Sequence, residues 1–224
     1  EIKALAAEGL ARREVALLYR SNAQSRALEH ALFTAGLPYR VYGGLRFFER
    51  QEIKHALAYL RLIANTDDDT AFARVVNFPV RGIGARSLEQ LQDAAKQQAA
   101  SLYAAIPQLA GKAKVFSALD TFVTLIEKLK SGCAGLTLPG VVEQMLEISG
   151  LRAHYLNDRE GQDRLSNLDE LVSAAANFIA EEGMVEEGAS ELASFLAHAS
   201  LEAGEHQAGD SDDAVQLMTV HSAK

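Results

Sequence analysis

The sequence of 224 residues has little of several features that mark particular classes of protein. It contains one cysteine, Cys133, so no internal disulfide can form, and a reducing, cytoplasmic location is expected. No apolar run approaches the ~20 residues that a membrane span needs. The N-terminus also lacks the layout of a signal peptide, so we expect no membrane partner. Six histidines are scattered without paired spacing, and the sequence alone therefore predicts no metal site.

Motifs of a free-standing catalyst are absent as well. There is no GxxxxGK[ST] loop, so the chain lacks the backbone cradle and the lysine that hold β- and γ-phosphates. No acidic run follows a buried strand to hold magnesium. No Ser/His/Asp or Cys/His arrangement has a supporting motif. We therefore expect this chain to be inactive as an enzyme by itself.

The charge of the chain is distributed unevenly. The net charge is −8, but residues 1–100 hold 14 Lys and Arg against 11 Asp and Glu. Residues 151–224 hold 4 Lys and Arg against 15 Asp and Glu. A phosphate-facing surface is therefore expected within the first hundred residues. The acidic part is either a plain solvated face or a surface for a basic partner.

Residues 15–44 have the pattern of a strand, a helix and a second strand. An apolar run stops at Tyr19-Arg20, a helical spacing of apolar residues ends at Gly36, and a β-rich run covers Tyr39–Tyr42. This order is typical of a parallel α/β sheet, whose ligands bind at the carboxyl ends of the strands. There Tyr19 offers a flat ring for stacking and Arg20 a fork that fits phosphate. The same pair can also be an ordinary surface pair.

Most of the remaining chain has helical periodicity. Phe47-Phe48 precede a helix and are expected in the core, and the acidic turn Asn65–Asp69 is expected to cap the helix that follows. Residues 101–208 predict an all-α bundle. The polar stretch 204–213 is the strongest linker candidate, and a β-rich run returns over Ala214–Val220. We therefore expect a mainly α fold with a small α/β part.

One glycine turn stands out between two predicted helices. It consists of Arg81, Gly82, Ile83 and Gly84, and Arg86 follows at the start of the next helix. A glycine turn before a helix exposes backbone N–H groups at the positive end of the helix dipole, where a phosphate can bind. A tight connection between helices gives the same pattern. The residues alone leave both interpretations open.

Four stretches of the sequence carry a family resemblance. They are LYRSNAQSR, GLPYRVYGGLRFFERQEIKHALAYLRLIAN, RVVNFPVRGIG and VQLMTVHSAK. In this order they resemble the UvrD/Rep/PcrA family of superfamily 1 DNA helicases. The likeness is strong up to about Ser87 and again over Ala214–Lys224, and looser between. Four ordered matches are far more specific than any single one.

The resemblance implies a fold and a set of domains. The chain is similar to the first half of the second RecA-like lobe, called 2A, together with the all-α subdomain inserted into it, called 2B. We expect the lobe over residues 1–80, the insertion over 81–208 and a linker with the return strand over 209–224. The boundary between lobe and insertion is expected to fall between residues 80 and 111.

The resemblance also implies functional residues and ligands. Tyr19 would stack on adenine, Arg20 would reach the γ-phosphate, and Thr219 and His221 would line the track of single-stranded DNA. ATP and Mg²⁺ belong to the complete enzyme, and neither is expected bound to this chain alone. The expected partners are a junction of single-stranded and duplex DNA and, on the acidic helical part, repair or replication proteins.

Three hypotheses about function follow. The first is a piece of an ATP-dependent 3′–5′ DNA helicase, because the chain begins without a helix cap and stops at HSAK, where family members continue GLEF. The second is a stand-alone module that binds DNA or protein without ATPase activity. The third is an all-α interaction protein with no role in nucleic-acid binding, for which the four matching stretches would be coincidences.

Overall fold

The computed structural model describes residues 1–111, 113–159, 161–181, 190–204 and 213–224, which form two compact units. Unit 1 contains residues 1–53 and 197–224, and unit 2 contains residues 54–196. The chain passes between the units within helix α3 (Gln51–Ala64) and again within helix α11 (Glu191–Gly204). These unit limits differ from the expected limits at residues 80 and 208, and the assignment to 2A and 2B stays a prediction. The expected linker falls largely outside the described residues.

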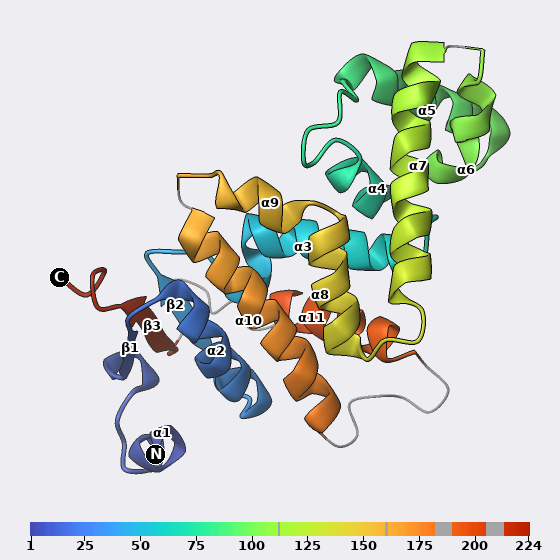
Figure 1. The fold of residues 1–224 in the computed structure, drawn as a ribbon. Helices are drawn as coiled ribbons and strands as arrows, with labels where there is room; N and C mark the ends of the chain where they lie inside the picture. The colour runs from blue at the N-terminus through green and yellow to red at the C-terminus, as the bar shows by residue number, and fades with distance from the viewer. Residues whose placement is uncertain (112, 160, 182–189, 205–212) are drawn as a thin grey trace. The chain divides into compact units, whose positions relative to one another are not determined.

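Unit 1 is built around a small parallel sheet. Its strands are β1 (Ala16–Tyr19), β2 (Tyr39–Tyr42) and β3 (Val215–Thr219), in the order β1-β3-β2 (Figure 1). Helix α2 (Ser25–Thr34) connects β1 to β2. Both outer strands pair in parallel with β3, so the strand that comes last in the sequence lies in the middle. The predicted order of strand, helix and strand is confirmed.

The sheet has a compact apolar core. Alternate residues of β3 point inward, as its half-buried pattern requires, and Val215 and Leu217 are fully buried. The buried cluster comprises Tyr19, Leu32, Leu37, Tyr39, Val215 and Leu217. Phe47 and Phe48 are also buried, as expected, at 1% and 4% exposure. The shorter elements of unit 1 are α1 (Ile2–Ala7) and the 3₁₀ turns η1 (Arg12–Glu14), η2 (Asn22–Gln24) and η3 (Phe47–Glu49).

Unit 2 contains most of α3 and the first part of α11, and the described elements between them are helices and one 3₁₀ turn. These elements are α4 (Asp69–Val75), α5 (Ala85–Gln98), α6 (Leu102–Ala105), η4 (Ile106–Leu109), α7 (Ala113–Cys133), α8 (Leu138–Ile148), α9 (Leu151–Leu156) and α10 (Gly161–Ala180). The Phe72 ring of α4 meets the Phe122 ring of α7 edge to face, 5.3 Å between centroids, and both rings are fully buried. Burying a side chain of this size stabilises the fold by about 1.5–3 kcal/mol.

The cap of α4 and the helical content of the later residues agree with the sequence-based predictions. The Asp68 Oδ1 atom accepts a hydrogen bond from the Ala71 N–H at 2.9 Å, which confirms that the acidic turn caps α4. The described elements of the predicted bundle over residues 101–208 are helices and one 3₁₀ turn, and the fold is mainly α with a small sheet, as expected. Among the described helices, none is long and apolar enough to cross a membrane.

Candidate functional site

Arg20 stands directly after β1, in a loop whose backbone is held in place. The N–H groups of Arg20 and Ser21 donate to the Gln24 Oε1 atom at 3.0 Å and 3.2 Å. The Val220 N–H donates to the Tyr19 carbonyl at 2.9 Å, which ties the same loop to the end of β3. The Arg20 side chain itself is exposed. The loop therefore presents a positive charge at a fixed point on the sheet edge.

The carboxyl ends of β1 and β3 bring four of the predicted site residues to one edge of the sheet. Tyr19 and Thr219 are partners in the register of these strands, and Arg20 and His221 follow them along their chains. The Thr219 Oγ1 atom lies 3.0 Å from the Ser222 Oγ atom and accepts the Ser222 N–H at 3.2 Å, so a tight turn follows the strand. His221 in this turn is exposed. Residues that the sequence separates by some 200 positions thus form one candidate site.

Tyr19 lies differently from Arg20. Its ring belongs to the apolar core of unit 1 and only 6% of the residue is exposed. Burial raises the pKa of its phenol, and the nearby Glu29 carboxylate raises the pKa further. We expected a ring with a face open for stacking, whereas in this structure Tyr19 is covered by its own unit. Stacking on adenine would require that cover to move.

A buried polar network lies behind Tyr19, and the sequence did not predict it. The Glu29 carboxylate accepts hydrogen bonds from the Ser25 hydroxyl at 2.6 Å and from the Phe47 N–H at 3.0 Å. The Arg50 guanidinium donates to the same hydroxyl at 2.6 Å and lies 3.8 Å from the carboxylate. Burial raises the pKa of Glu29 and lowers the pKa of Arg50. The network joins α2 to the segment that follows β2, and so holds in place the helix that follows the β1 end of the site.

The glycine turn is in unit 2, where Asn77 shapes it. The Asn77 Oδ1 atom accepts the N–H groups of Arg81 at 2.9 Å and of Ile83 at 3.0 Å. Gly82 has a φ of 76°, a backbone conformation that residues with a Cβ atom rarely adopt. Ile83 is 1% exposed and anchors the turn in the apolar interior. Two hydrogen bonds therefore hold the backbone of the turn, and the Ile83 side chain is buried.

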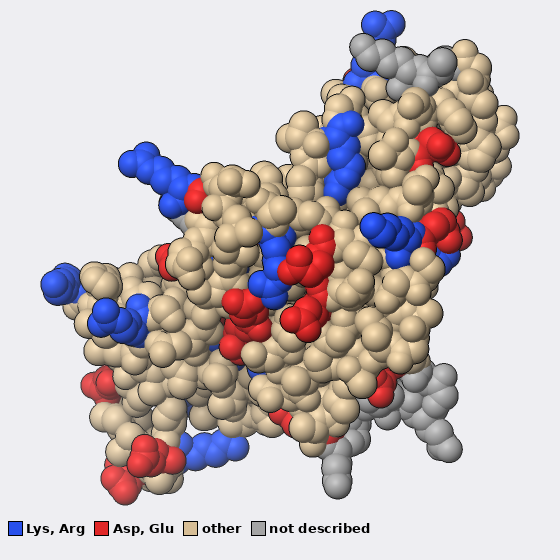
Figure 2. All heavy atoms as spheres, viewed as in Figure 1, with Lys and Arg blue, Asp and Glu red and all other residues tan. Residues whose placement is uncertain are grey.

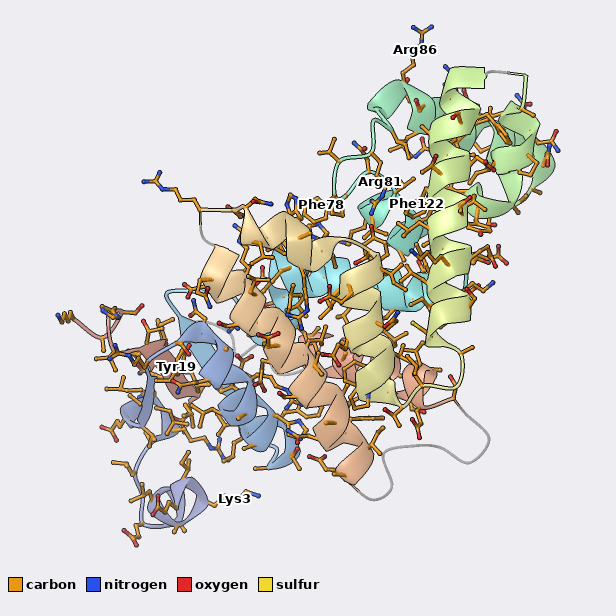
Figure 3. The ribbon with its side chains drawn as sticks, in the orientation of Figure 1. Lys3, Tyr19, Phe78, Arg81, Arg86 and Phe122 are labelled. Atoms are coloured by element: carbon orange, nitrogen blue, oxygen red, sulfur yellow. The ribbon has the colours of Figure 1, made fainter. Side chains whose placement is uncertain are left out.

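Arg81 turns its charge into the protein. Its guanidinium donates to the carbonyl oxygens of Val75 at 3.1 Å, Pro79 at 3.0 Å and Ser149 at 3.0 Å. It also lies over the rings of Tyr59 and Phe122, 5.7 Å and 5.6 Å from their centroids. Figure 3 shows Arg81 beside Phe122. These contacts join the end of α4 and the turn after it to the end of α8, so in this structure the guanidinium stabilises the fold. A contact of Arg81 with a DNA phosphate stays a prediction.

Arg86 and the start of α5 remain open to solvent. Gly84 is the N-cap of α5 and has no side chain to cap the helix. The N–H groups of Ser87 and Leu88 donate to the Gly84 carbonyl at 3.0 Å and 3.2 Å, whereas those of Ala85 and Arg86 come before the first acceptor that the helix offers. Arg86 is exposed and extends away from the ribbon in Figure 3. The positive end of the helix dipole, the N–H groups of Ala85 and Arg86 and the exposed Arg86 guanidinium together suit a phosphate. Of the two arginines predicted at this turn, the geometry favours Arg86 for such a contact.

Charged side chains on the visible surface do not form a broad basic area. On the face drawn in Figure 2, Lys and Arg side chains stand apart from one another, and several lie beside an acidic group. Over α8 and α10, acidic and basic groups adjoin. Arg152 of α9 pairs with Glu147 of α8 at 3.0 Å and with Asp169 of α10 at 2.7 Å. On this face, a phosphate contact would therefore depend on local geometry more than on a broad area of positive charge.

Comparisons with known proteins give a consistent result. The model of the UvrD-like helicase C-terminal domain matches residues 1–224. The chain is 49% identical to the DNA helicase II of Escherichia coli over all of its length, and covers 32% of that protein. It is 46% identical to the DNA helicase II of Haemophilus influenzae over 94% of its length, covering 30% of that protein. It is 39% identical to the ATP-dependent DNA helicase PcrA of Bacillus subtilis, with 94% of the chain and 29% of the relative covered. The chain thus spans about a third of the length of these relatives.

Proposed function

The chain belongs to the UvrD-like helicase C-terminal domain family, and from that premise we propose that it is part of an ATP-dependent 3′–5′ DNA helicase. The observation that carries the proposal is the sheet edge of unit 1. Arg20 and His221 lie there in adjacent loops at the ends of neighbouring parallel strands. A cation at this place can contact a nucleotide phosphate, while the neighbouring strand end reaches DNA, so one edge serves both ligands.

In this proposal Arg20 contacts the γ-phosphate of ATP in the complete helicase. Its backbone is fixed by Gln24 and its side chain is exposed, so it can approach a phosphate held by another lobe without refolding. An arginine supplied in this way stabilises the charge that develops during phosphoryl transfer. The chemistry of ATP bound with Mg²⁺ is supplied by the complete enzyme, because the P-loop is not part of this chain. Tyr19 would contact adenine once its ring is uncovered.

DNA contacts are proposed at two places. Thr219 and His221 would line the path of the single strand at the sheet edge. Arg86 and the N–H groups at the start of α5 would hold a duplex phosphate, with Gly82, Ile83 and Gly84 forming the turn. Arg81 would support that turn from inside, through its three carbonyl contacts. Contacts of this kind position DNA without reading its sequence.

The nucleotide role of Arg20 can be tested in the complete helicase that contains this chain. We expect Arg20→Ala to lower kcat for ATP hydrolysis with saturating single-stranded DNA by about 10³-fold, the lower end of what such arginines contribute. Arg20→Lys keeps the charge without the fork and should recover part of the rate. Lys3→Ala is the control, since Lys3 is an exposed cation on α1 of the same unit. A kcat for Arg20→Ala equal to that of the Lys3 control would contradict the proposal.

The acidic surface of the later helices is proposed as a second area of interaction. Repair or replication proteins with basic surfaces would bind there, by charge complementarity with the excess of Asp and Glu over residues 151–224. If this chain were instead a binding module without a role in ATP hydrolysis, Arg20→Ala would leave the ATPase rate unchanged. The ATPase measurement therefore separates the two candidates.

A further inference from the structure

A cluster of metal-binding side chains lies away from the sheet edge described above. It consists of His30 on α2 with His198 and Glu202 on α11, all within unit 1. His198 and Glu202 are four residues apart, which places both on one face of α11. The cluster could not be predicted from the sequence, because His30 and His198 approach each other only in the fold, where α2 and α11 come together.

The three side chains already converge on one point. The Glu202 Oε1 atom lies 2.5 Å from His30 Nδ1 and 2.8 Å from His198 Nε2. The two imidazole rings are 5.6 Å apart between centroids and nearly perpendicular, at 74°. All three potential ligand atoms lie within 4.8 Å of one another. In tetrahedral zinc sites, bonds of about 2.0–2.2 Å separate the ligand atoms by roughly 3.5 Å. Shifts of under about 1 Å would therefore open the cluster around an ion.

The surroundings hold the cluster in this arrangement. The side chain of Glu202 is 3% exposed, and those of His30 and His198 are 15% and 11% exposed, so the ligands are fixed while solvent still reaches the histidines. The Phe33 ring packs edge-on against His198 at 5.9 Å. The Arg46 guanidinium donates to the backbone carbonyl of Ala203 at 2.5 Å, which fastens the end of α11. Supporting contacts of this kind orient ligands in metal sites.

The donor set selects a class of metal. Two imidazole nitrogens and one carboxylate oxygen suit Zn²⁺, Co²⁺ or Ni²⁺, whereas Mg²⁺ and Ca²⁺ prefer oxygen ligands alone. Three protein ligands leave a fourth position for water. We propose that His30, His198 and Glu202 bind one divalent transition-metal ion, with Zn²⁺ as the chemically favoured occupant, and that this ion links α2 to α11. This site is independent of the proposed helicase function.

The test is metal binding by the 224-residue chain after treatment with a chelator. Calorimetric titration with Zn²⁺ should show one ion bound per chain, and Co²⁺ should give the intense visible absorption of a tetrahedral complex. Zinc at 100-fold excess over Kd should raise the Tm by several degrees, since it binds the folded chain. Loss of a direct ligand in Glu202→Gln or His198→Asn should raise the Kd by more than about 100-fold, beyond what loss of a supporting contact costs.

Glu8→Gln is the matched control, because it removes an exposed carboxylate of the same unit from outside the cluster. It should bind zinc as the unchanged chain does. Far-UV circular dichroism of each variant without metal verifies that the chain is folded. The proposal is overturned if zinc binding does not saturate at one ion, if folded Glu202→Gln binds zinc as tightly as the unchanged chain, or if the Co²⁺ spectrum is that of the hydrated ion.

Discussion

Replacing Arg81 gives the most quantitative prediction from this structure. Arg81 donates three hydrogen bonds to backbone carbonyls and lies over two aromatic rings. Hydrogen bonds from a charged group contribute about 1.5–3 kcal/mol each, and a cation over a ring about 0.5–1 kcal/mol. Water replaces part of these interactions at this half-buried position. We therefore expect Arg81→Ala to lower the free energy of unfolding by about 3–5 kcal/mol.

Urea unfolding followed by circular dichroism measures this effect. Arg86→Ala is the matched control, because Arg86 is exposed and its replacement should change the stability by less than about 0.5 kcal/mol. Arg81→Lys should fall between the two, since an ammonium group cannot reach three carbonyls in the geometry of a fork. If Arg81→Ala and Arg86→Ala were equally stable, the inward-facing role of Arg81 would be refuted.

Three further predictions concern unit 2. Gly82→Ala should destabilise the chain by about 1–2 kcal/mol, because Gly82 has a φ of 76°. Gly84→Ala should be nearly neutral, because Gly84 has a φ of −85°. Thermal unfolding of the two variants measures the difference. Asn77→Ala should cost about 1–3 kcal/mol by removing the acceptor of two N–H groups in the turn, and Asn77→Asp should retain most of the stability in the same assay. Burial and then the nearby Arg74 lower the pKa of His55 from 6.5 to about 4, so the folded state disfavours the proton. Stability should therefore decline as pH falls from about 6.5 to about 4, by roughly 1–2 kcal/mol after solvent screening, and His55→Gln should flatten this dependence of the urea midpoint on pH.

The local elements of the fold could be predicted from the sequence because their signals are local. The apolar run before Tyr19, the helical spacing that ends at Gly36 and the acidic cap at Asp68 each lie within a few residues of the element they specify. The position of β3 between β1 and β2 could not be predicted from local signals. It depends on pairing between strands far apart in the chain, which no local periodicity encodes.

The direction of individual side chains could not be predicted. Arg81 and Arg86 flank the same turn in the sequence, but one is drawn inward by carbonyl oxygens and the other stays in solvent. The buried position of Tyr19 likewise depends on packing against β3, which lies far away in the sequence. The cluster of His30, His198 and Glu202 forms only through the packing of α2 and α11. The directions of the two arginines, the burial of Tyr19 and the three-residue cluster all depend on tertiary packing.

Fluorescence anisotropy with a duplex that bears a 3′ single-stranded tail tests the DNA-binding claim most directly. The 224-residue chain is compared with Arg86→Ala across a salt series, and with Arg81→Lys under conditions where it is folded. We predict binding that weakens with salt, and a loss of about one unit in the slope of log Kd against log salt for Arg86→Ala alone. If Arg86→Ala bound DNA with an unchanged slope and affinity, the start of α5 would not be the phosphate contact.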